Sequence, residues 1–353
     1  MPSRVYDDRR CRGSTGLSHD TGAHMSVSWS KIARIHARTL SVSLSVGLLL
    51  VAGAATPGYA GTADLRMSSK GTVAFQAANS RLWVTGITGN GKELNFSVMP
   101  GTSPAISAGT GQTTVLTGTV VFQGSNGNLW AAAAGSGSGG DHRQPMAPGT
   151  GPTVSTDGTR VAYQGSNGRL WTTDGRSYTD SGLAMAPGTS PSIASTSQVA
   201  FQGADGYLWT TRGGRTDLAM MPGTSPASSR DGVIAFQGAN GNLWIIRVGG
   251  GTDDTGFAMA PGTSPNMSTM STNWDLTRIA FQGANGNLWT TVASVNRLGK
   301  DWGYPMMPGT SAGVSADAAE VAFHGSNGHL YTISENDSVR ELGFTLAAGT
   351  SPA

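Results

Sequence analysis

The sequence predicts an all-β protein, a seven-bladed β-propeller with four short antiparallel strands in each blade. Three observations support this prediction: a hairpin motif occurs seven times, a turn motif follows each copy, and no apolar run has helical periodicity. The chain has 353 residues, of which 52 are glycine, and only 12% are charged. So much glycine without a strict three-residue period is typical of short strands joined by tight turns, and excludes collagen.

The hairpin motif is the octet Gln-Gly-(Ser/Ala)-Asn-Gly-x-Leu-Trp. Six copies begin at Gln76, Gln123, Gln164, Gln202, Gln237 and Gln282, and a seventh runs from His324 to Tyr331. β-Branched and aromatic residues flank each copy, as at residues 161–163 and 170–173, and indicate two strands. The Asn-Gly pair between them (Asp-Gly at Asp205) predicts a type I′ turn, in which both central residues have positive φ.

The turn motif is Met-x-Pro-Gly-Thr-Ser-Pro or a near variant. Its proline stands at Pro100, Pro148, Pro187, Pro222, Pro261 and Pro308, and Ala348 takes its place in the last copy. Proline fixes the first φ of such a turn and glycine takes the positive one. A third strand, as at residues 183–185, and a fourth, as at residues 192–194, complete four strands per unit, which is one propeller blade.

The repeats are expected to close into a ring. Seven units over residues 61–353 average about 42 residues, near the length of a propeller blade. This region begins with Gly61-Thr62 and ends with Gly349-Thr350-Ser351-Pro352 before the last alanine. Both ends therefore fall at the same point within the repeat, as a closed ring requires. The units deviate most at Ala77, Ser80, His324, Tyr331 and Ala348, which we interpret as adjustments where the ring closes. An open stack with polar caps is the alternative.

Residues 1–60 are predicted to be a leader with a secretion signal, and residues 61–353 a single propeller domain. Lys31, Arg34 and Arg38 precede an uncharged apolar run at residues 40–55, and small residues predict cleavage after Ala60. The run is shorter than the roughly 20 residues of a membrane-spanning helix. Met25 is the expected start of translation. The sequence therefore predicts a secreted, extracellular protein without a membrane anchor after cleavage.

The charge balance of the propeller region argues against some partners. The chain carries a net charge of +2, but residues 1–60 hold seven Lys/Arg against three Asp/Glu, which leaves 16 against 18 for residues 61–353. That region therefore gives no electrostatic case for nucleic acid or an anionic membrane. The only cysteine of the chain is Cys11, in the predicted leader. The propeller region therefore has no disulfide and no thiolate chemistry.

The repeated polar and aromatic residues are candidates for ligand binding in the gaps between blades. They are Gln123, Asn126, Trp130, Gln164, Asn167, Trp171, Gln202, Asp205, Trp209, Gln237, Asn240, Trp244, Gln282, Asn285 and Trp289. Amides pair with sugar hydroxyls and aromatic rings pack on the C–H faces of sugars. With no charge in the consensus, neutral glycans on a cell surface are the expected partner, bound weakly at several sites. A purely structural role is the alternative, with Trp and Met packing between blades and Gln bonded to backbone.

The repeats resemble those of secreted actinobacterial proteins, on the evidence of Phe281–Trp289 and Met259–Pro265. In general build they are similar to the tachylectin-2, tectonin and fucose-binding bacterial propeller lectins. The resemblance covers residues 61–353 and implies a propeller and a lectin-like function. The Ser-x-Asp-x-Gly-x-x-Trp order of sialidase propellers is missing, so no sialidase chemistry follows from it.

Two other functions stay open. An enzyme would need singular residues near the axis, but the propeller region has only His142, His324 and His329, no repeated carboxylate beside them, and a single adjacent acidic pair at Asp253-Asp254. No catalytic motif, metal site or cofactor is predicted. A scaffold for protein–protein interaction would use variable loops such as residues 135–141 and 247–255.

Overall fold

The computed structural model describes residues 71–108, 118–193, 198–269, 277–294, 297–334 and 336–353. All of them belong to Thr56–Ala353, the second of two units into which the chain divides. The predicted leader lies outside the described residues. Within the described ranges, no helix is long and apolar enough to cross a membrane.

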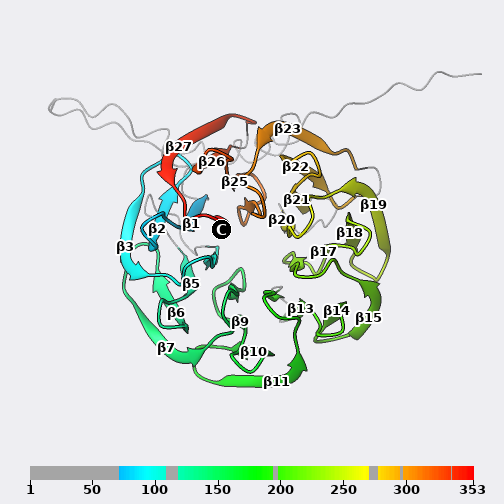
Figure 1. Cartoon of the computed structure of the whole chain (residues 1–353), viewed down its shortest axis with the longest axis horizontal. Helices are drawn as coiled ribbons and strands as arrows, with labels where there is room; N and C mark the ends of the chain where they lie inside the picture. Colours follow the sequence, from blue (N-terminus) through cyan, green and yellow to red (C-terminus); the bar gives the residue numbers. More distant parts are fainter. Residues whose placement is uncertain (1–70, 109–117, 194–197, 270–276, 295–296, 335) are drawn as a thin grey trace, which may run out of the picture. The chain divides into compact units, whose positions relative to one another are not determined.

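Seven antiparallel sheets follow one another around a central axis, and the predicted seven-bladed β-propeller is confirmed (Figure 1). Blade 1 consists of β1 (Thr72–Gln76), β2 (Arg81–Gly86) and β3 (Lys92–Ser97). Blade 2 consists of β4 (Ala105–Ile106), β5 (Thr119–Gln123), β6 (Asn128–Ala133) and β7 (Gly139–Pro145). Blade 3 consists of β8 (Thr153–Val154), β9 (Val161–Gln164), β10 (Arg169–Thr173) and β11 (Tyr178–Ala184).

The remaining four blades repeat the same plan. Blade 4 consists of β12 (Ser192–Ile193), β13 (Val199–Gln202), β14 (Tyr207–Thr210) and β15 (Gly214–Ala219). Blade 5 consists of β16 (Ala227–Ser228), β17 (Ile234–Gln237), β18 (Asn242–Ile246) and β19 (Thr252–Ala258). Blade 6 consists of β20 (Asn266–Thr269), β21 (Thr277–Gln282), β22 (Asn287–Val292) and β23 (Lys300–Pro305). Blade 7 consists of β24 (Gly313–Val314), β25 (Val321–His324), β26 (His329–Ile333) and β27 (Val339–Thr345).

The sequence unit and the blade are offset by one strand, which corrects the expectation that one unit forms one blade. Ser192 and Ile193 follow the turn at Pro187, yet they pair with Ala200 and Val199 of the next sheet. The fourth strand of each unit is therefore the innermost strand of the following blade, and the turn motif is the linker between two blades. Each unit thereby ties two neighbouring blades together.

The hairpin turns differ from the predicted type I′ geometry. Gly127, Gly168 and Gly206 have φ of 82°, 75° and 81°, whereas the Asn or Asp before them keeps a negative φ. The Gly127 amide donates to the carbonyl of Gly124 at 2.8 Å, and the Gly124 amide to that of Asn128 at 2.9 Å. This is a three-residue loop, a type I turn closed by a glycine in the left-handed region.

Apolar side chains fill the gaps between blades. In the gap between blades 3 and 4, Leu170 and Met185 pack with Phe201, and Trp209 lies against this cluster. The Phe201 and Trp209 rings are stacked with centroids 6.3 Å apart. A buried side chain of this kind contributes roughly 1.5–3 kcal/mol. The structural interpretation of the repeated Trp and Met as packing between blades is therefore confirmed.

The two ends of the described unit meet in blade 1, which rules out the open stack. The amide of Ala353 donates to the carbonyl of Ala74 at 2.9 Å, and the Ala74 amide to the carbonyl of Ala353 at 2.8 Å. Ala353 thus occupies the place that Ala105 has in blade 2, where it pairs with Val121. The rings of Phe75 and Phe344 meet across the same junction, with centroids 5.5 Å apart.

The turn motifs are also connected by a series of hydrogen bonds around the axis, which the sequence did not reveal. Within each motif, the Thr hydroxyl donates to the carbonyl three residues earlier, as Thr189 does to Ala186 at 2.8 Å. The backbone amide after this Thr then donates to the serine Oγ of the next motif. Six such bonds follow one another, and in each the amide of one residue donates to the Oγ of the next in this order: Gly151, Ser190, Ser225, Ser264, Ser311, Ser351 and Ser103. Gly151 stands where the other motifs have serine, and offers no Oγ.

Candidate functional site

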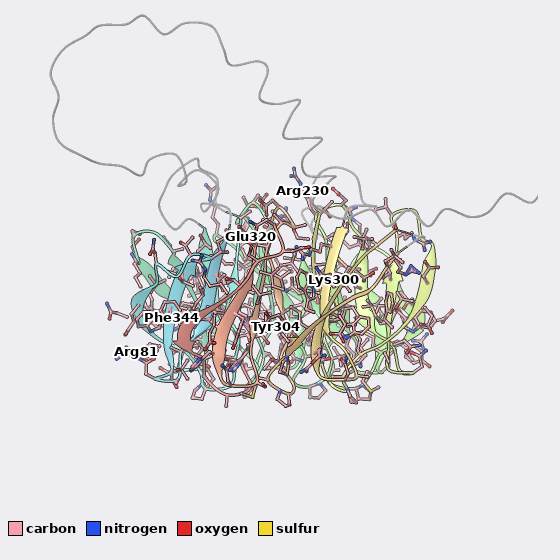
Figure 2. All side chains as sticks on the ribbon, turned by 90° about the horizontal axis from the view of Figure 1, so that it is seen from above. Arg81, Arg230, Lys300, Tyr304, Glu320 and Phe344 are labelled. Atoms are coloured by element: carbon pink, nitrogen blue, oxygen red, sulfur yellow. The ribbon has the colours of Figure 1, made fainter. Side chains whose placement is uncertain are left out.

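The propeller has two distinct faces. We call the side that carries the octet hairpins and the Pro-Gly turns the hairpin face, and the other side the opposite face. In the side view, Arg230 and Glu320 lie at the opposite face, while Arg81, directly after its hairpin, lies toward the hairpin face (Figure 2). The predicted ligand residues of the octets all belong to hairpins, so they share the hairpin face.

The repeated glutamines lie beneath the hairpin face. Gln76, Gln123, Gln164, Gln202, Gln237 and Gln282 are 0–2% exposed. The Gln123 amide donates to the carbonyls of Gly127 at 3.3 Å and Ala147 at 3.2 Å. Ala147 belongs to the linker, and its backbone amide donates to the backbone carbonyl of Gln164 in the next blade at 2.9 Å. The glutamine thus joins its hairpin to the linker, out of reach of a ligand at the surface.

The repeated asparagines and tryptophans bind one another. The indole Nε1 of Trp130 donates to Oδ1 of Asn126 at 3.0 Å, and this oxygen also accepts the Asn128 amide at 3.2 Å. The same indole bond recurs in the pairs Asn167–Trp171, Asp205–Trp209, Asn240–Trp244 and Asn285–Trp289, at 2.9–3.1 Å. All five indoles are half-buried.

Glycine is required beneath each indole. A Cβ on Gly165 would lie 2.5 Å from Cδ1 of Trp171, closer than real Cβ atoms come to another heavy atom. The second residue of the octet therefore lets the ring lie flat over its own hairpin.

A carboxylate completes each cluster, and this corrects the expectation that charge is absent from the consensus. Asp141 on β7 faces Trp130 in the sheet register and accepts the amide of Asn126 at 2.8 Å and that of Asn128 at 3.0 Å. Asp180, Asp254 and Asp301 accept the equivalent asparagine amides at 2.7–3.1 Å. We call the Asn, Asp and Trp of blades 2, 3, 5 and 6 the rim clusters.

The carboxylates that the third strand contributes to the clusters can be located in the sequence. Glu93, Asp141, Asp180, Asp254, Asp301 and Glu341 each stand seven residues before the proline of the turn motif, or before Ala348. Their distance from the preceding Trp varies because the connecting loops differ in length. Alignment on the octet alone therefore hides them, whereas alignment on the turn motif reveals them.

Against the effect of burial, hydrogen bonds lower the pKa of three rim carboxylates, Asp141, Asp254 and Asp301. Burial acts to raise the pKa of Asp254, but hydrogen bonds from the Gly256 amide, Asn242 and Asn240 outweigh it, so the pKa lies below its ordinary value. The same competition, with the Gly303 amide, Asn285 and Asn287 as donors, lowers the pKa of Asp301. The clusters of blades 2, 5 and 6 therefore present a charged acceptor between amide donors.

Blade 4 carries the same cluster with the charges exchanged. Asp205 replaces asparagine in the hairpin, and Arg215 occupies the carboxylate position opposite Trp209. The Arg215 guanidinium donates to Asp205 at 2.8 Å, while the other Asp205 oxygen accepts the indole at 2.9 Å. The carboxylate of a cluster can thus lie either on the third strand or in the hairpin, with a hydrogen-bond donor at the other position.

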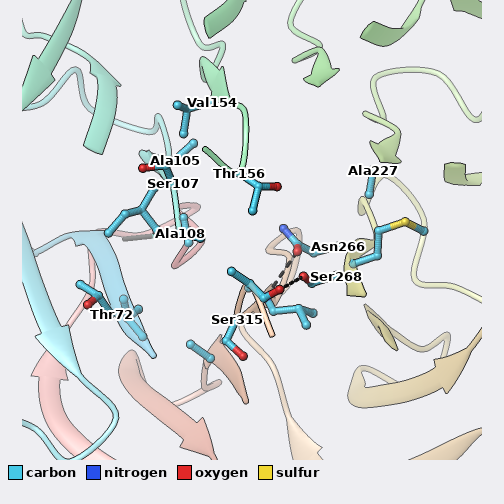
Figure 3. A pocket seen from close by; sticks show the side chains of 18 of the residues that line it. Thr72, Ala105, Ser107, Ala108, Val154, Thr156, Ala227, Asn266, Ser268 and Ser315 are labelled. Carbon is cyan, nitrogen blue, oxygen red and sulfur yellow. Dashed lines mark hydrogen bonds between the residues drawn. The ribbon is translucent and has the colours of Figure 1, made fainter. Parts of the chain in front are cut away.

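The axis of the ring holds a cavity of ≈ 200 Å³ toward the opposite face. Figure 3 shows its polar side chains, which include Thr156, Asn266, Ser268 and Ser315. Two of these already have backbone partners: Asn266 accepts the Val314 amide at 3.3 Å, and Ser268 donates to the Ala316 carbonyl at 2.8 Å. None of the predicted octet residues lines it.

A second cavity, of ≈ 250 Å³, lies between blades 3 and 4. Leu170, Ile193 and Val199 give it an apolar floor, and Thr172, Thr179 and Ser181 add hydroxyls. Arg160 and Asp174 also line it. Hydrogen bonds from the Ser177 and Arg176 amides lower the pKa of Asp174 to about 2. We call this cavity the 3/4 cleft.

The three histidines of the propeller region stand apart from one another. Nδ1 of His142 lies 2.6 Å from the Tyr178 hydroxyl, and Nδ1 of His324 lies 2.9 Å from the Thr350 carbonyl. His329 contacts Glu341 in the blade 7 hairpin. In the described part of the chain, no three His, Cys, Asp or Glu residues are grouped so that they would hold a metal ion.

Comparisons with solved structures find similar propellers. The SapL1 lectin, solved with alpha methyl fucoside, is 18% identical, with a TM-score of 0.50 over 72% of this chain and 98% of its own. The Aleuria aurantia lectin, solved as a mutant with Fucα1-6GlcNAc, is 16% identical, with a TM-score of 0.45 over 70% and 96%. TolB from Acinetobacter baumannii is 14% identical, with a TM-score of 0.46 over 81% and 67%.

Structural neighbours of the chain thus include fucose-binding lectin propellers. At such identity the likeness shows the fold alone. No protein-family model matches the sequence, and no curated protein matches it.

Proposed function

We propose that the protein is a lectin-like carbohydrate-binding protein that holds neutral sugars weakly at its rim clusters and engages glycan surfaces multivalently. One observation carries the proposal: the same asparagine, carboxylate and half-buried indole recur in blades 2, 3, 5 and 6. The likeness in fold to the SapL1 lectin, whose structure holds alpha methyl fucoside, supports it.

The chemistry of a rim cluster suits a sugar. A sugar hydroxyl both donates and accepts, so it can donate to the Asp141 carboxylate and accept from the Asn126 or Asn128 amide. The exposed part of the Trp130 ring offers an apolar surface for the C–H face of the same sugar. In this proposal the glutamines position the hairpins, and Asp141, Asp254 and Asp301 join the predicted Asn and Trp as ligand contacts.

Several weak sites on one rigid ring gain by acting together. A second site that binds the same glycan surface does so at an effective concentration set by the ring, and avidity then exceeds single-site affinity by roughly 10²–10⁴. Loss of one cluster should therefore weaken binding to a surface in part, and loss of several should abolish it.

A glycan array with the purified protein tests the proposal. We expect several related neutral glycans to bind, a graded loss for Asp141→Ala, Asp254→Ala and Asp301→Ala singly, and near-complete loss for the triple variant, which keeps only the single weak cluster of blade 3. Asp217→Ala is the matched control, because that carboxylate lies outside the hairpins and its side chain is fully exposed. A silent array, or a triple variant that binds like the unaltered protein, would overturn the proposal.

A second candidate function, a scaffold for a protein partner, rests on two exposed apolar side chains. Leu298 is 74% exposed and Val248 is 49% exposed. Both neighbour arginines that pair with Asp253, namely Arg247 and Arg297. If the array is silent, capture of one protein that is lost with Leu298→Ser and Val248→Ser favours this function instead.

We also propose that the protein is exported and cleaved after Ala60. The basic residues, apolar run and small residues before that position support this. N-terminal sequencing of protein from the culture medium should begin at Gly61, and a start far from it would contradict the proposal.

A further inference from the structure

The gap between blades 6 and 7 holds an indole ring in the space that is open in the 3/4 cleft. Trp302 follows Asp301 on β23 and packs against the apolar cluster that includes Leu288 and Val321. Its indole Nε1 donates to the hydroxyl of Thr290 at 2.9 Å. The Arg278 guanidinium carbon lies 6.0 Å from the centroid of the same ring.

The 3/4 cleft has the same surroundings without the ring. Sheet register makes the positions equivalent: Trp171 faces Asp180 as Trp289 faces Asp301, so Ser181 occupies the place of Trp302. By the same register, Thr172 corresponds to Thr290. Arg160, four residues before the octet glutamine, corresponds to Arg278 in the same place.

The floor of the cleft matches as well. Leu170 holds the octet position of Leu288, and Val199, three residues before its octet, corresponds to Val321. The Trp302 ring packs against the cluster that contains Leu288 and Val321. Ile193 corresponds to Val314 on the innermost strand. The 3/4 cleft therefore has room for one ring, with an apolar surface beneath it.

Several polar groups that line the cleft make no hydrogen bond within the described residues, although Ser181 donates to the Leu170 carbonyl at 2.8 Å. Arg278 donates to the carbonyl of Ala319 at 2.9 Å, whereas the Arg160 guanidinium and the hydroxyls of Thr172 and Thr179 make no hydrogen bond within the described residues. Thr172 and Thr179 are direct cross-strand neighbours, so their hydroxyls lie on one wall. Asp174 gives the cleft a charged acceptor, and its negative charge offsets the positive charge of Arg160.

We propose that the 3/4 cleft binds one neutral monosaccharide residue, a second kind of site on the opposite side of the ring from the rim clusters. The inference deepens the proposed function and rests on it for the ligand class. A sugar ring takes the place that the indole has in the 6/7 gap, with its C–H face on Leu170 and Val199. Its hydroxyls bond to Thr172, Thr179 and Asp174. A cavity of ≈ 250 Å³ is smaller than the ~300–1,000 Å³ of sites for drug-sized ligands, which suits a single residue.

The decisive variant is Ser181→Trp, which rebuilds the 6/7 arrangement in the cleft. The new indole would fill the cavity and donate to Thr172, as Trp302 donates to Thr290. We expect this variant to fold with an unchanged or raised Tm and to lose monosaccharide binding. Ser181→Ala, which leaves the cavity open, is the matched control and should retain binding.

Calorimetric titration separates the cleft from the rim clusters. The background is the quadruple variant Asp141→Ala, Asp180→Ala, Asp254→Ala and Asp301→Ala, and the probes are the methyl glycosides of glucose, galactose, mannose and fucose. At about 10 mM, above a ~1 mM dissociation constant for a weak site, we expect one sugar per chain. Thr172→Val combined with Thr179→Val should weaken this binding at least tenfold, and Arg176→Gln, a neighbouring exposed arginine outside the cleft, should not change it.

Three results would overturn the inference: no titration with any of the four glycosides, equal binding after Ser181→Trp, or equal binding after the double threonine change. The failure of the proposed function gives a different pattern. A silent array together with one sugar bound per chain refutes the multivalent rim clusters and keeps the cleft. Array binding that needs the aspartates but ignores Ser181→Trp, with no titration, keeps the rim clusters and refutes the cleft.

Discussion

The backbone amide of Ser351 donates to the Oγ of Ser103 at 2.9 Å, although the two residues are 248 positions apart in the chain. This bond is one of six equivalent bonds between successive turn motifs. It lies at the junction where Ala353 pairs with Ala74. The last linker is therefore fixed to the first by the same contact that joins five other pairs of successive linkers.

Removing this serine hydroxyl should lower stability by a modest amount. Ser103→Ala leaves the half-buried Ser351 amide without its acceptor, which costs roughly 0.5–1.5 kcal/mol of unfolding free energy. Ser264→Ala removes the equivalent bond inside the ring and should have an equal effect. Urea unfolding of both variants measures the two losses. A loss for Ser264→Ala alone would mean that the junction is not closed in solution.

A carboxylate should not be tolerated in place of a repeated glutamine. Gln237 is 0% exposed, and its amide donates to the carbonyls of Gly241 at 3.3 Å and Ala260 at 3.1 Å. Gln237→Glu removes this donor and places an acceptor against two carbonyl oxygens. We expect a loss of roughly 2–7 kcal/mol, partly recovered at acidic pH, where the new carboxyl is protonated. Thermal unfolding at two pH values checks this, and an unchanged Tm at neutral pH would contradict it.

The exchanged charges of blade 4 should be replaceable as a pair. Asp205→Asn alone removes the closer of the two carboxylates that Arg215 contacts, leaving only the exposed Asp217, and should lower the Tm. The double variant Asp205→Asn with Arg215→Asp recreates the asparagine and aspartate of blade 2, so we expect its Tm to return toward that of the unaltered protein. Differential scanning calorimetry of the three proteins gives the coupling. If the double variant is no better than Asp205→Asn, the clusters are not interchangeable.

His324 should make stability depend on pH near neutrality. Burial lowers its pKa below the ordinary 6.5, so the unfolded chain binds a proton at a higher pH than the folded protein does. Stability is therefore complete above pH 6.5 and falls as the pH drops through the range below it. His324→Gln, which introduces the residue of the six other octets, should reduce the fall in Tm between pH 7.5 and pH 5. Equal slopes for both proteins would refute the assignment.

The sequence was sufficient for the architecture because its two motifs are copied with fixed internal spacing. The register of the hairpins, the interface packing of Trp and Met, and the closed ring all follow from that spacing. The turn type did not follow, because an Asn-Gly pair fits two loops. The Asn126 side chain, bonded to the Trp130 indole and the Asn128 amide, stabilises the longer one.

The composition of the candidate sites was harder to predict. Asp141 and its equivalents join the clusters from a third strand whose loop varies in length, so spacing from the octet hides them. The 3/4 cleft depends on a small side chain, Ser181, at a position where Trp302 fills the corresponding gap. A cavity defined by what is missing leaves no motif, and only the comparison of equivalent gaps reveals it.

The one-strand offset between unit and blade has a consequence for how such a protein changes length. Because every unit supplies the innermost strand of its successor, a duplicated or deleted unit still presents matching edges to its neighbours. The circumference can therefore grow or shrink by whole units without leaving any sheet incomplete. The same offset means that no single unit carries a finished sheet, so a fragment cut at the motif boundaries would have a vacant inner edge at its start.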